Sequence, residues 1–120
     1  MVNHVKHVGS LRYAAPDYPV RGGRLRVGMG DARVDLSGMR VPEGTHVLRV
    51  HVGMGDLHLT RPTSLPTRIE ADVGMGDIRV GAQTDSGIGN RVEWEDPGYA
   101  KAVSRLLIVA SVSMGDIKIP

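Results

Sequence analysis

The 120-residue chain contains no cysteine and no phenylalanine, and it has only one tryptophan. Without cysteine it forms no disulfide bond and has no thiolate for catalysis or metal binding. It also lacks an apolar run long enough for a membrane-spanning helix, and no signal-peptide pattern is present. We therefore expect the chain as given to be soluble, and we leave open that it is a segment of a membrane protein.

A strong charge imbalance and helical periodicity are missing as well. The formal net charge is only +2, whereas a nucleic-acid-binding domain would cluster basic residues on one face together with stacking aromatics. Apolar residues do not recur at helical spacing, and residues 97–105, the nearest candidate, are interpreted as a loop. The sequence thus predicts one domain without long helices and without a nucleic-acid partner.

One five-residue stretch occurs four times and ends each time in Met-Gly-Asp. Residues 27–31, 52–56 and 73–77 read Val-Gly-Met-Gly-Asp, and residues 112–116 read Val-Ser-Met-Gly-Asp. Each copy lies between two short runs in which apolar and other residues alternate. Four copies in such a small domain predict a repeat architecture.

The apolar residues around each copy predict its geometry. Before the second copy, Leu48, Val50 and Val52 alternate with polar residues, as in a half-buried strand. After Gly-Asp the alternation resumes at Leu57 and Leu59 with the opposite parity, so one residue is inserted, as happens at a glycine corner. We predict an all-β fold, a β-solenoid-like stack of units that each consist of a strand, a glycine corner and a second strand. The predicted structural corners contain Gly28, Gly30, Asp31, Gly53, Gly55, Asp56, Gly74, Gly76, Asp77, Gly115 and Asp116.

Outside the repeats, the sequence has an N-terminal part and an irregular part. Residues 1–23 are interpreted as an arm with a short strand that leads into a turn, and residues 24–120 as the repeat-built β domain. The aspartates of the repeats are 25, 21 and 39 residues apart, and the long interval has room for a decayed copy at residues 86–90, with Ile88 in the methionine place. Residues 81–105 as a whole are rich in turn-forming residues and are interpreted as irregular.

Three sets of residues have the chemistry of metal ligands, and each has a simpler interpretation that we favour. His4 and His7 would offer two imidazoles, but no third ligand is near them in the sequence, so a solvated arm explains them better. The four corner aspartates fall short of the six to eight oxygens that calcium needs, and we expect them to form hydrogen bonds at the corners. The four methionines would suit copper, but their parity predicts that they point inward and fill the corner of the core. We predict no metal and no cofactor.

A basic residue follows each corner aspartate by two positions. Arg33, His58, Arg79 and Lys118 are here called the basic row, because alternation places all four on the outward face beside the aspartates. Two interpretations stay open. The favoured one is a solvated face with weak cross-strand ion pairs. The other is a surface for an anionic partner such as a lipid headgroup.

Signatures of catalysis are also missing from the sequence. It contains no Gly-x-Ser-x-Gly elbow and no phosphate-binding loop. The acidic residues are spread regularly along the repeats, whereas a catalytic pair would be isolated in a cleft. We therefore predict no catalytic residue and a protein that is not an enzyme.

The order of the repeats resembles a known family of domains. Residues 48–59 read Leu-Arg-Val-His-Val-Gly-Met-Gly-Asp-Leu-His-Leu, a polar loop with two prolines follows, and residues 69–80 repeat the pattern. Over residues 10–119 this is similar to the toastrack domain, the C-terminal domain of LiaF-like and phage-shock-protein-C-containing proteins of bacterial envelope stress. The resemblance implies a solenoid-like sensory or interaction module without catalytic residues. It also implies a membrane-associated parent protein and a membrane-embedded partner, often a histidine kinase.

Two functions therefore remain to be separated. In the first, the domain is a protein-interaction module whose exposed strand edges, or residues 81–105, meet a partner or a second copy of the chain. In the second, the basic row binds an anionic lipid or ligand, and an adhesin-like surface role is a weaker third hypothesis. Salt separates the first two, because attraction to lipid through the basic row would fade as ionic strength rises.

Overall fold

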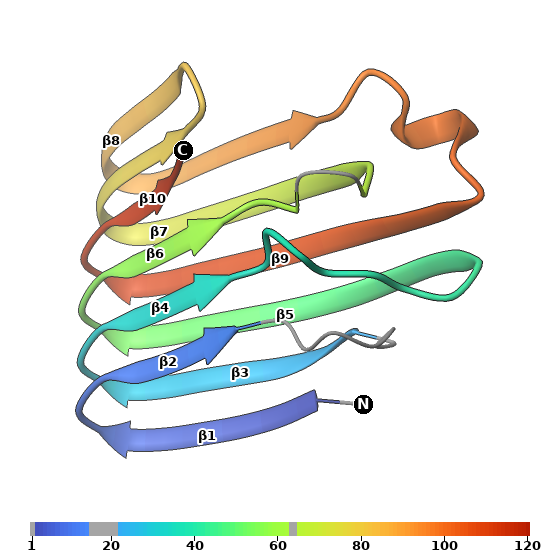
Figure 1. Cartoon of the computed structure of the whole chain (residues 1–120). Helices are drawn as coiled ribbons and strands as arrows, with labels where there is room; N and C mark the ends of the chain where they lie inside the picture. The colour runs from blue at the N-terminus through green and yellow to red at the C-terminus, as the bar shows by residue number, and fades with distance from the viewer. Residues whose placement is uncertain (1, 15–21, 63–64) are drawn as a thin grey trace.

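The computed structural model describes residues 2–14, 22–62 and 65–120, which form a single coiled sheet (Figure 1). One short 3₁₀ turn, η1 (Tyr99–Lys101), is the helical element of this part of the chain. The strands are β1 (Val2–Val8), β2 (Leu11–Ala14), β3 (Gly22–Met29), β4 (Ala32–Asp35), β5 (Gly44–Met54), β6 (Leu57–Thr60), β7 (Thr67–Val80), β8 (Gln83–Glu95), β9 (Ser104–Met114) and β10 (Ile117–Ile119).

The strands are stacked as the coils of a solenoid with two faces. β1, β3, β5, β9 and β7 pair in parallel and form the long face. β2, β4, β6 and β10 pair in parallel on the short face, where the second half of β7 lies beside β10. Each coil turns from the long face to the short face at one glycine corner, on the left in Figure 1. The predicted all-β, solenoid-like stack is confirmed.

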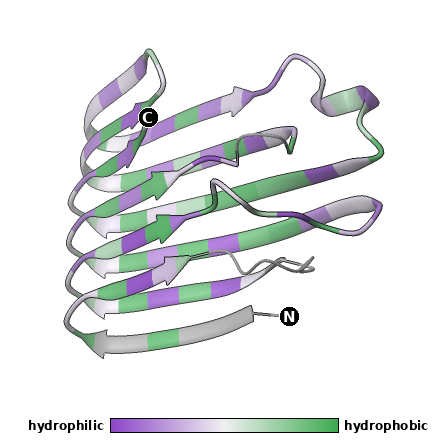
Figure 2. Ribbon diagram, viewed as in Figure 1, coloured by the Kyte–Doolittle hydropathy of each residue, from purple (hydrophilic) through white to green (hydrophobic). Residues whose placement is uncertain are grey.

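The core is a set of aliphatic ladders between the two faces. Parallel pairing without a shift places the same repeat position of every coil in one line, as in the ladder of Val27, Val52, Val112 and Val73. These side chains are almost fully buried and face a second ladder from the short strands, formed by Ala32, Leu57, Ile117 and Ile78. Figure 2 shows the resulting alternation of hydrophobic and hydrophilic residues along the strands. Each large aliphatic side chain buried in this way contributes about 1.5–3 kcal/mol.

The coils do not follow the order of the sequence. β9, which carries the fourth copy of the repeat, lies between β5 and β7, the strands of the second and third copies. Leu107 and Val109, on the outward side of β9, are half-buried, and the inward residues of this strand are also apolar. A central position suits such a strand. Both of its edges are paired, and β5 and β7 flank its outward apolar residues.

Residues 81–105 are largely regular, and the interpretation of this segment as irregular is wrong. β8 runs antiparallel to β7 over 12 registered pairs, from Arg68 with Glu95 to Val80 with Gln83. The reversal is made at Gly81, whose φ of 58° is accessible to glycine. The sequence conceals this strand, because its first half, residues 83–89, is exposed on both faces and has no apolar alternation.

The decayed copy at residues 86–90 is not a further parallel coil. It lies within β8 and runs in the opposite direction past the third copy, which places Ile88 opposite Met75 and Asn90 opposite Val73. Ile88 thus occupies the methionine place in space, although by antiparallel pairing. Ser86, and not Asn90, lies opposite Asp77.

Residues 2–14 also differ from the expected arm. β1 and β2 form a coil of the same sheet, paired with β3 and β4. Gly9 makes its corner, where the Gly9 N–H donates to Met29 O at 2.8 Å and the Leu11 N–H donates to Asp31 O at 2.8 Å. In the sequence, this corner is marked by Val8-Gly9-Ser10. Like Met-Gly-Asp it has a glycine between an apolar and a polar residue, but the flanking residues differ. Residues 15–21, within the expected arm and turn, lie outside the described residues.

Candidate functional site

Each corner depends on a glycine that no other residue can replace without strain. Gly30, Gly55, Gly115 and Gly76 have φ between 130° and 138°, a region that L side chains rarely adopt. A Cβ at any of them would also overlap the carbonyl oxygen of the corner glycine in the next coil, for example that of Gly55 in the case of Gly115. The coils therefore approach each other at the corner more closely than side chains allow.

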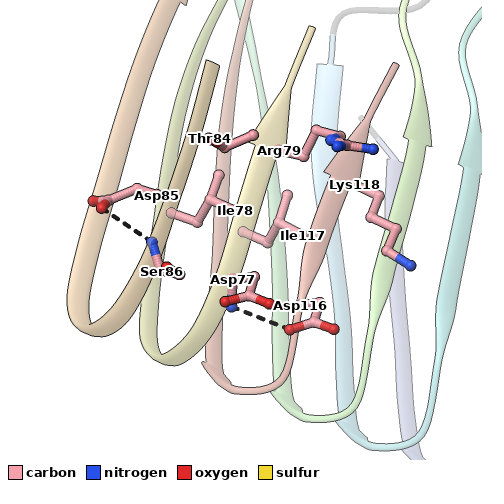
Figure 3. Close-up of a pocket in the computed structure, with 9 residues that line it drawn as sticks. All are labelled: Asp77, Ile78, Arg79, Thr84, Asp85, Ser86, Asp116, Ile117 and Lys118. Atoms are coloured by element: carbon pink, nitrogen blue, oxygen red, sulfur yellow. Dashed lines mark hydrogen bonds between the residues drawn. The ribbon is translucent and has the colours of Figure 1, made fainter. Parts of the chain in front are cut away.

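The aspartates after these glycines form one row that links the coils. The Asp56 N–H donates to Asp31 Oδ1 at 3.2 Å, the Asp116 N–H donates to Asp56 Oδ1 at 3.2 Å, and the Asp77 N–H donates to Asp116 Oδ1 at 3.1 Å. Figure 3 shows the last of these bonds. We call Asp31, Asp56, Asp116 and Asp77 the aspartate row. The expected hydrogen bonds at the corners are present, and they run from one coil to the next.

The corner methionines point outward, and the prediction that they fill the core is wrong. Met29, Met54, Met114 and Met75 are 46–51% exposed. The chain bends around the core between the inward valine and the next inward apolar residue, so the residue at the convex apex projects into solvent. Val8 at one end and Ile88 at the other continue the line, at 70% and 82% exposure. We call the line of Val8, Met29, Met54, Met114, Met75 and Ile88 the methionine ridge.

The basic row is assembled on the short face as its spacing predicts. Arg33 lies beside His58, His58 beside Lys118, and Lys118 beside Arg79 on neighbouring strands. Arg12, which the sequence analysis did not include, lies beside Arg33 and lengthens this line of cations by one strand.

Two open hollows lie along the basic row. One, of about 390 Å³, is lined by Arg12, Arg33 and His58. The other, of about 380 Å³, is lined by Arg79, Lys118 and two members of the aspartate row, Asp77 and Asp116, and Figure 3 shows its lining residues. No ion pair between the aspartate row and the basic row occurs within the described residues. The geometry therefore leaves the basic row available for a partner.

A second cationic cluster lies on the outer side of the long face and was missed by sequence reasoning. Arg24 lies beside Arg49, and Arg26 lies beside His51, on the neighbouring strands β3 and β5. These four side chains line an open hollow of about 230 Å³, which we call the arginine hollow. His51 Nδ1 and Ser111 Oγ are hydrogen-bonded at 2.8 Å. Burial lowers the pKa of His51, and the positive charge of Arg26 acts in the same direction.

The described residues contain neither a cluster of metal ligands nor a helix that could span a membrane. Among the described residues, no group of three or more His, Asp or Glu side chains is placed to hold a metal ion. The side chains of His4 and His7, the candidate imidazole pair, lie outside the described residues. In the part of the chain that the structure describes, no helix has the length and hydropathy of a membrane span.

The coil order, the glycine corners and the four-fold repeat together define a β-solenoid of the toastrack type. The chain belongs to the family described as cell wall-active antibiotics response LiaF, C-terminal, whose model matches residues 7–119. It is 21% identical over 112 residues to Protein LiaF of Bacillus subtilis (strain 168), an alignment that covers 93% of this chain and 46% of that protein. This chain therefore spans about half the length of that curated relative.

A solved structure supports the fold independently. A candidate cell adhesion protein from Clostridium sporogenes ATCC 15579 has a similar fold, with a TM-score of 0.65 over 98% of this chain and 90% of that chain. The two sequences are 13% identical, so the likeness concerns the fold alone. Family membership, by contrast, relates this domain to the envelope stress response of bacteria to antibiotics that act on the cell wall.

Proposed function

We propose that this chain is a non-catalytic interaction domain of an envelope-stress protein and that it meets its partner through the methionine ridge. The observation that carries the proposal is the exposure of six apolar side chains in one unbroken line, at 46–82% each. Apolar lines of this kind on the surface of a folded protein mark contact sites. Three of the four aspartates beside the ridge, Asp31, Asp56 and Asp116, accept hydrogen bonds from neighbouring coils, which is a structural role and needs no substrate.

The size and chemistry of the ridge favour an extended apolar partner. Six strands at a spacing of about 4.8 Å give a ridge of roughly 24 Å, the length of a helix of about 16 residues. Methionine side chains are flexible and polarisable and adapt to irregular apolar surfaces. A helix with one apolar stripe would therefore fit along this ridge without a preformed groove.

The two flanks of the ridge set the charge of that partner. On one side, each methionine is preceded by a small residue: Gly28, Gly53, Ser113 and Gly74. These small residues keep this flank low, and a Cβ at Gly53 or Gly74 would overlap a carbonyl oxygen of the neighbouring coil. On the other side, the four carboxylates of the aspartate row run parallel to the ridge. A partner segment with lysine or arginine beside its apolar stripe would match both flanks.

A membrane-embedded signalling protein of the same stress response, such as a histidine kinase, is the partner class that we propose. The family relates the domain to the response to cell-wall antibiotics, and the matched relative is about twice as long as this chain. In this scheme the domain belongs to a membrane-associated protein, and the ridge reports the state of the envelope through association or release of the partner.

Photo-crosslinking in cells tests this proposal. In the full-length protein, a photoreactive amino acid replaces Met54 on the ridge or, as the control, Thr60 on the exposed end of β6. We expect a crosslink to one membrane protein from position 54, none from position 60, and loss of the stress-promoter response when the four ridge methionines become glutamine. The proposal fails if the crosslinks from both positions are the same, or if the glutamine variant keeps a normal response.

The basic row supports a second candidate function, the binding of anionic lipid or ligand. The register places Arg33, His58, Lys118 and Arg79 in one line without ion pairs to the aspartates, which favours this reading over a paired, solvated face. Replacing Arg33, Arg79 and Lys118 by alanine should then abolish binding to anionic vesicles at low salt. Association through the ridge should persist in this variant and at high salt.

A further inference from the structure

The positive charges of the arginine hollow are not balanced by acidic residues of the same face. Arg24 and Arg49 occupy directly opposed positions on paired strands, and like charges in such positions destabilise a sheet. Within the described residues, Arg24, Arg26 and Arg49 form no ion pair. The fold therefore maintains a repulsive cluster without an internal counter-charge.

The acidic residues of the same face are occupied elsewhere. Arg68 lies 3.7 Å from Glu70, 3.6 Å from Glu93 and 2.9 Å from Glu95. Arg91 bridges Asp72 and Glu93 in the same way. This network belongs to β7 and β8, and β9 separates it from the arginine hollow on β3 and β5. The outer face is thus polarised, with paired charges at one end and unpaired cations at the other.

We propose that the arginine hollow is a binding site for a phosphate group, carried either by a lipid headgroup or by a soluble phosphoester. Guanidinium groups bind phosphate oxygens through pairs of parallel N–H donors, and three of them surround this hollow. His51, held by Ser111 at 2.8 Å, adds a fourth polar side chain of defined orientation. No Phe, Tyr or Trp side chain lines the hollow as a platform for a base, so the chemistry favours a phosphate group over a nucleic acid.

The site is distinct from the basic row and from the methionine ridge. The arginine hollow lies on the outer side of the long face, whereas the basic row lies on β4, β6, β10 and the second half of β7. A phosphate ligand here leaves the ridge uncovered. The proposed partner and this ligand can therefore bind at the same time, and each can be tested alone.

Two variants with the same change in net charge test the proposal. The hollow variant carries Arg24→Gln, Arg26→Gln and Arg49→Gln. The matched control carries Arg40→Gln, Arg91→Gln and Lys101→Gln, three exposed cations outside the arginine hollow and the basic row. Binding of inorganic phosphate to the 120-residue chain is followed by amide chemical shifts at constant ionic strength, and binding to vesicles of phosphatidylglycerol and phosphatidylcholine by flotation.

We expect the hollow variant to bind inorganic phosphate about tenfold more weakly than wild type, and the control less than about twofold more weakly. Loss of vesicle binding in the hollow variant alone would identify a lipid headgroup as the source of the phosphate. Phosphate binding without such a vesicle effect would identify a soluble phosphoester. Equal losses in both variants, a loss in the control alone, or no phosphate binding by wild type would overturn the proposal.

Discussion

The corner aspartates and methionines lie two residues apart on the same coils. Although both are repeated from coil to coil, the aspartate row connects the coils and the methionine ridge lies on their surface. Asp31, Asp56 and Asp116 each accept an N–H from the next aspartate of the row, so that row joins coil to coil. The four methionines are about half exposed and point away from the core. A residue repeated in every coil therefore either stabilises the stack or forms a continuous line on its surface.

The difference between the rows follows from the direction of the bend at the corner. The glycine after each methionine allows two coils to approach until backbone atoms touch, and the next N–H then comes within reach of a short carboxylate. The methionine precedes this contact on the convex side, where about half of its surface stays exposed. The aspartates therefore join the coils, whereas the methionines lie outside the buried core.

The largest expected loss of stability comes from a side chain placed in the close contact between the corner glycines of neighbouring coils. Gly115→Ala places a Cβ against the carbonyl oxygen of Gly55 and forces alanine into a φ of 138°. We expect a loss of at least about 3 kcal/mol in the free energy of unfolding, measured by urea denaturation. Gly38→Ala is the matched control, because a Cβ there meets no atom within 4 Å. A small effect at Gly115 would mean that the corner is less tight than described.

A smaller loss is expected from breaking the aspartate row alone. Asp116→Ala removes the acceptor of the Asp77 N–H and should cost about 1 kcal/mol in the free energy of unfolding. Asp77→Ala is the control at the end of the row, since the Asp77 carboxylate accepts no hydrogen bond within the described residues and should cost clearly less. Asp116→Asn keeps an acceptor oxygen and should restore most of the loss. Equal losses in the free energy of unfolding for both alanine variants would show that the hydrogen bonds of the row do not stabilise the stack.

The strands and corners could be predicted from the sequence because one periodic rule governs them. Val50 and Val52 alternate before the corner, Leu57 and Leu59 after it, and the inserted glycine makes the bend visible in the parity. The same rule failed for the methionines, because parity is defined only within a strand and Met54 sits where the strand ends and the bend begins. Local pattern thus determines the coil but not the direction of a side chain at its apex.

Long-range features had no comparable signal. The position of β9 between β5 and β7 depends on the path of the chain after β8, and β8 itself has no apolar alternation in its first half. The basic row could be found because its members share one repeat position. The arginine hollow was not found, because Arg24 and Arg49 share one repeat position in only two copies, and the other two copies have Glu70 and Val109 there. Only pairing of β3 with β5 brings them together.

Replacing the ridge methionines should abolish partner binding while the stability of the domain changes little. With Met29, Met54, Met75 and Met114 all changed to glutamine, the free energy of unfolding should change by about 1 kcal/mol or less, because the side chains are half exposed and glutamine has a similar length. The proposed partner should no longer crosslink to such a variant. A large loss of stability would instead mean that the ridge packs within this chain, and the contrast with the aspartate row would disappear.

The smallest expected effect concerns His51, an outward residue three positions before Met54 that is partly withdrawn from water. Because burial and Arg26 lower its pKa in the folded state, the unfolded chain binds a proton more readily. The contribution of neutral His51 is fully present above the ordinary histidine pKa of about 6.5 and is lost as pH falls below that value.

Unfolding free energies at pH 7.5 and pH 5.5 measure this contribution, with His51→Gln as the control that cannot titrate. Wild type should lose more stability than the variant over this interval, and the other histidines cancel in the difference between the two proteins. Such a pH dependence would show that His51 is partly packed, in agreement with its 2.8 Å hydrogen bond to Ser111. A ridge methionine has no such bond. If wild type and variant instead respond identically to pH, His51 is solvated like the ridge, and the hollow around it is more open than its geometry indicates.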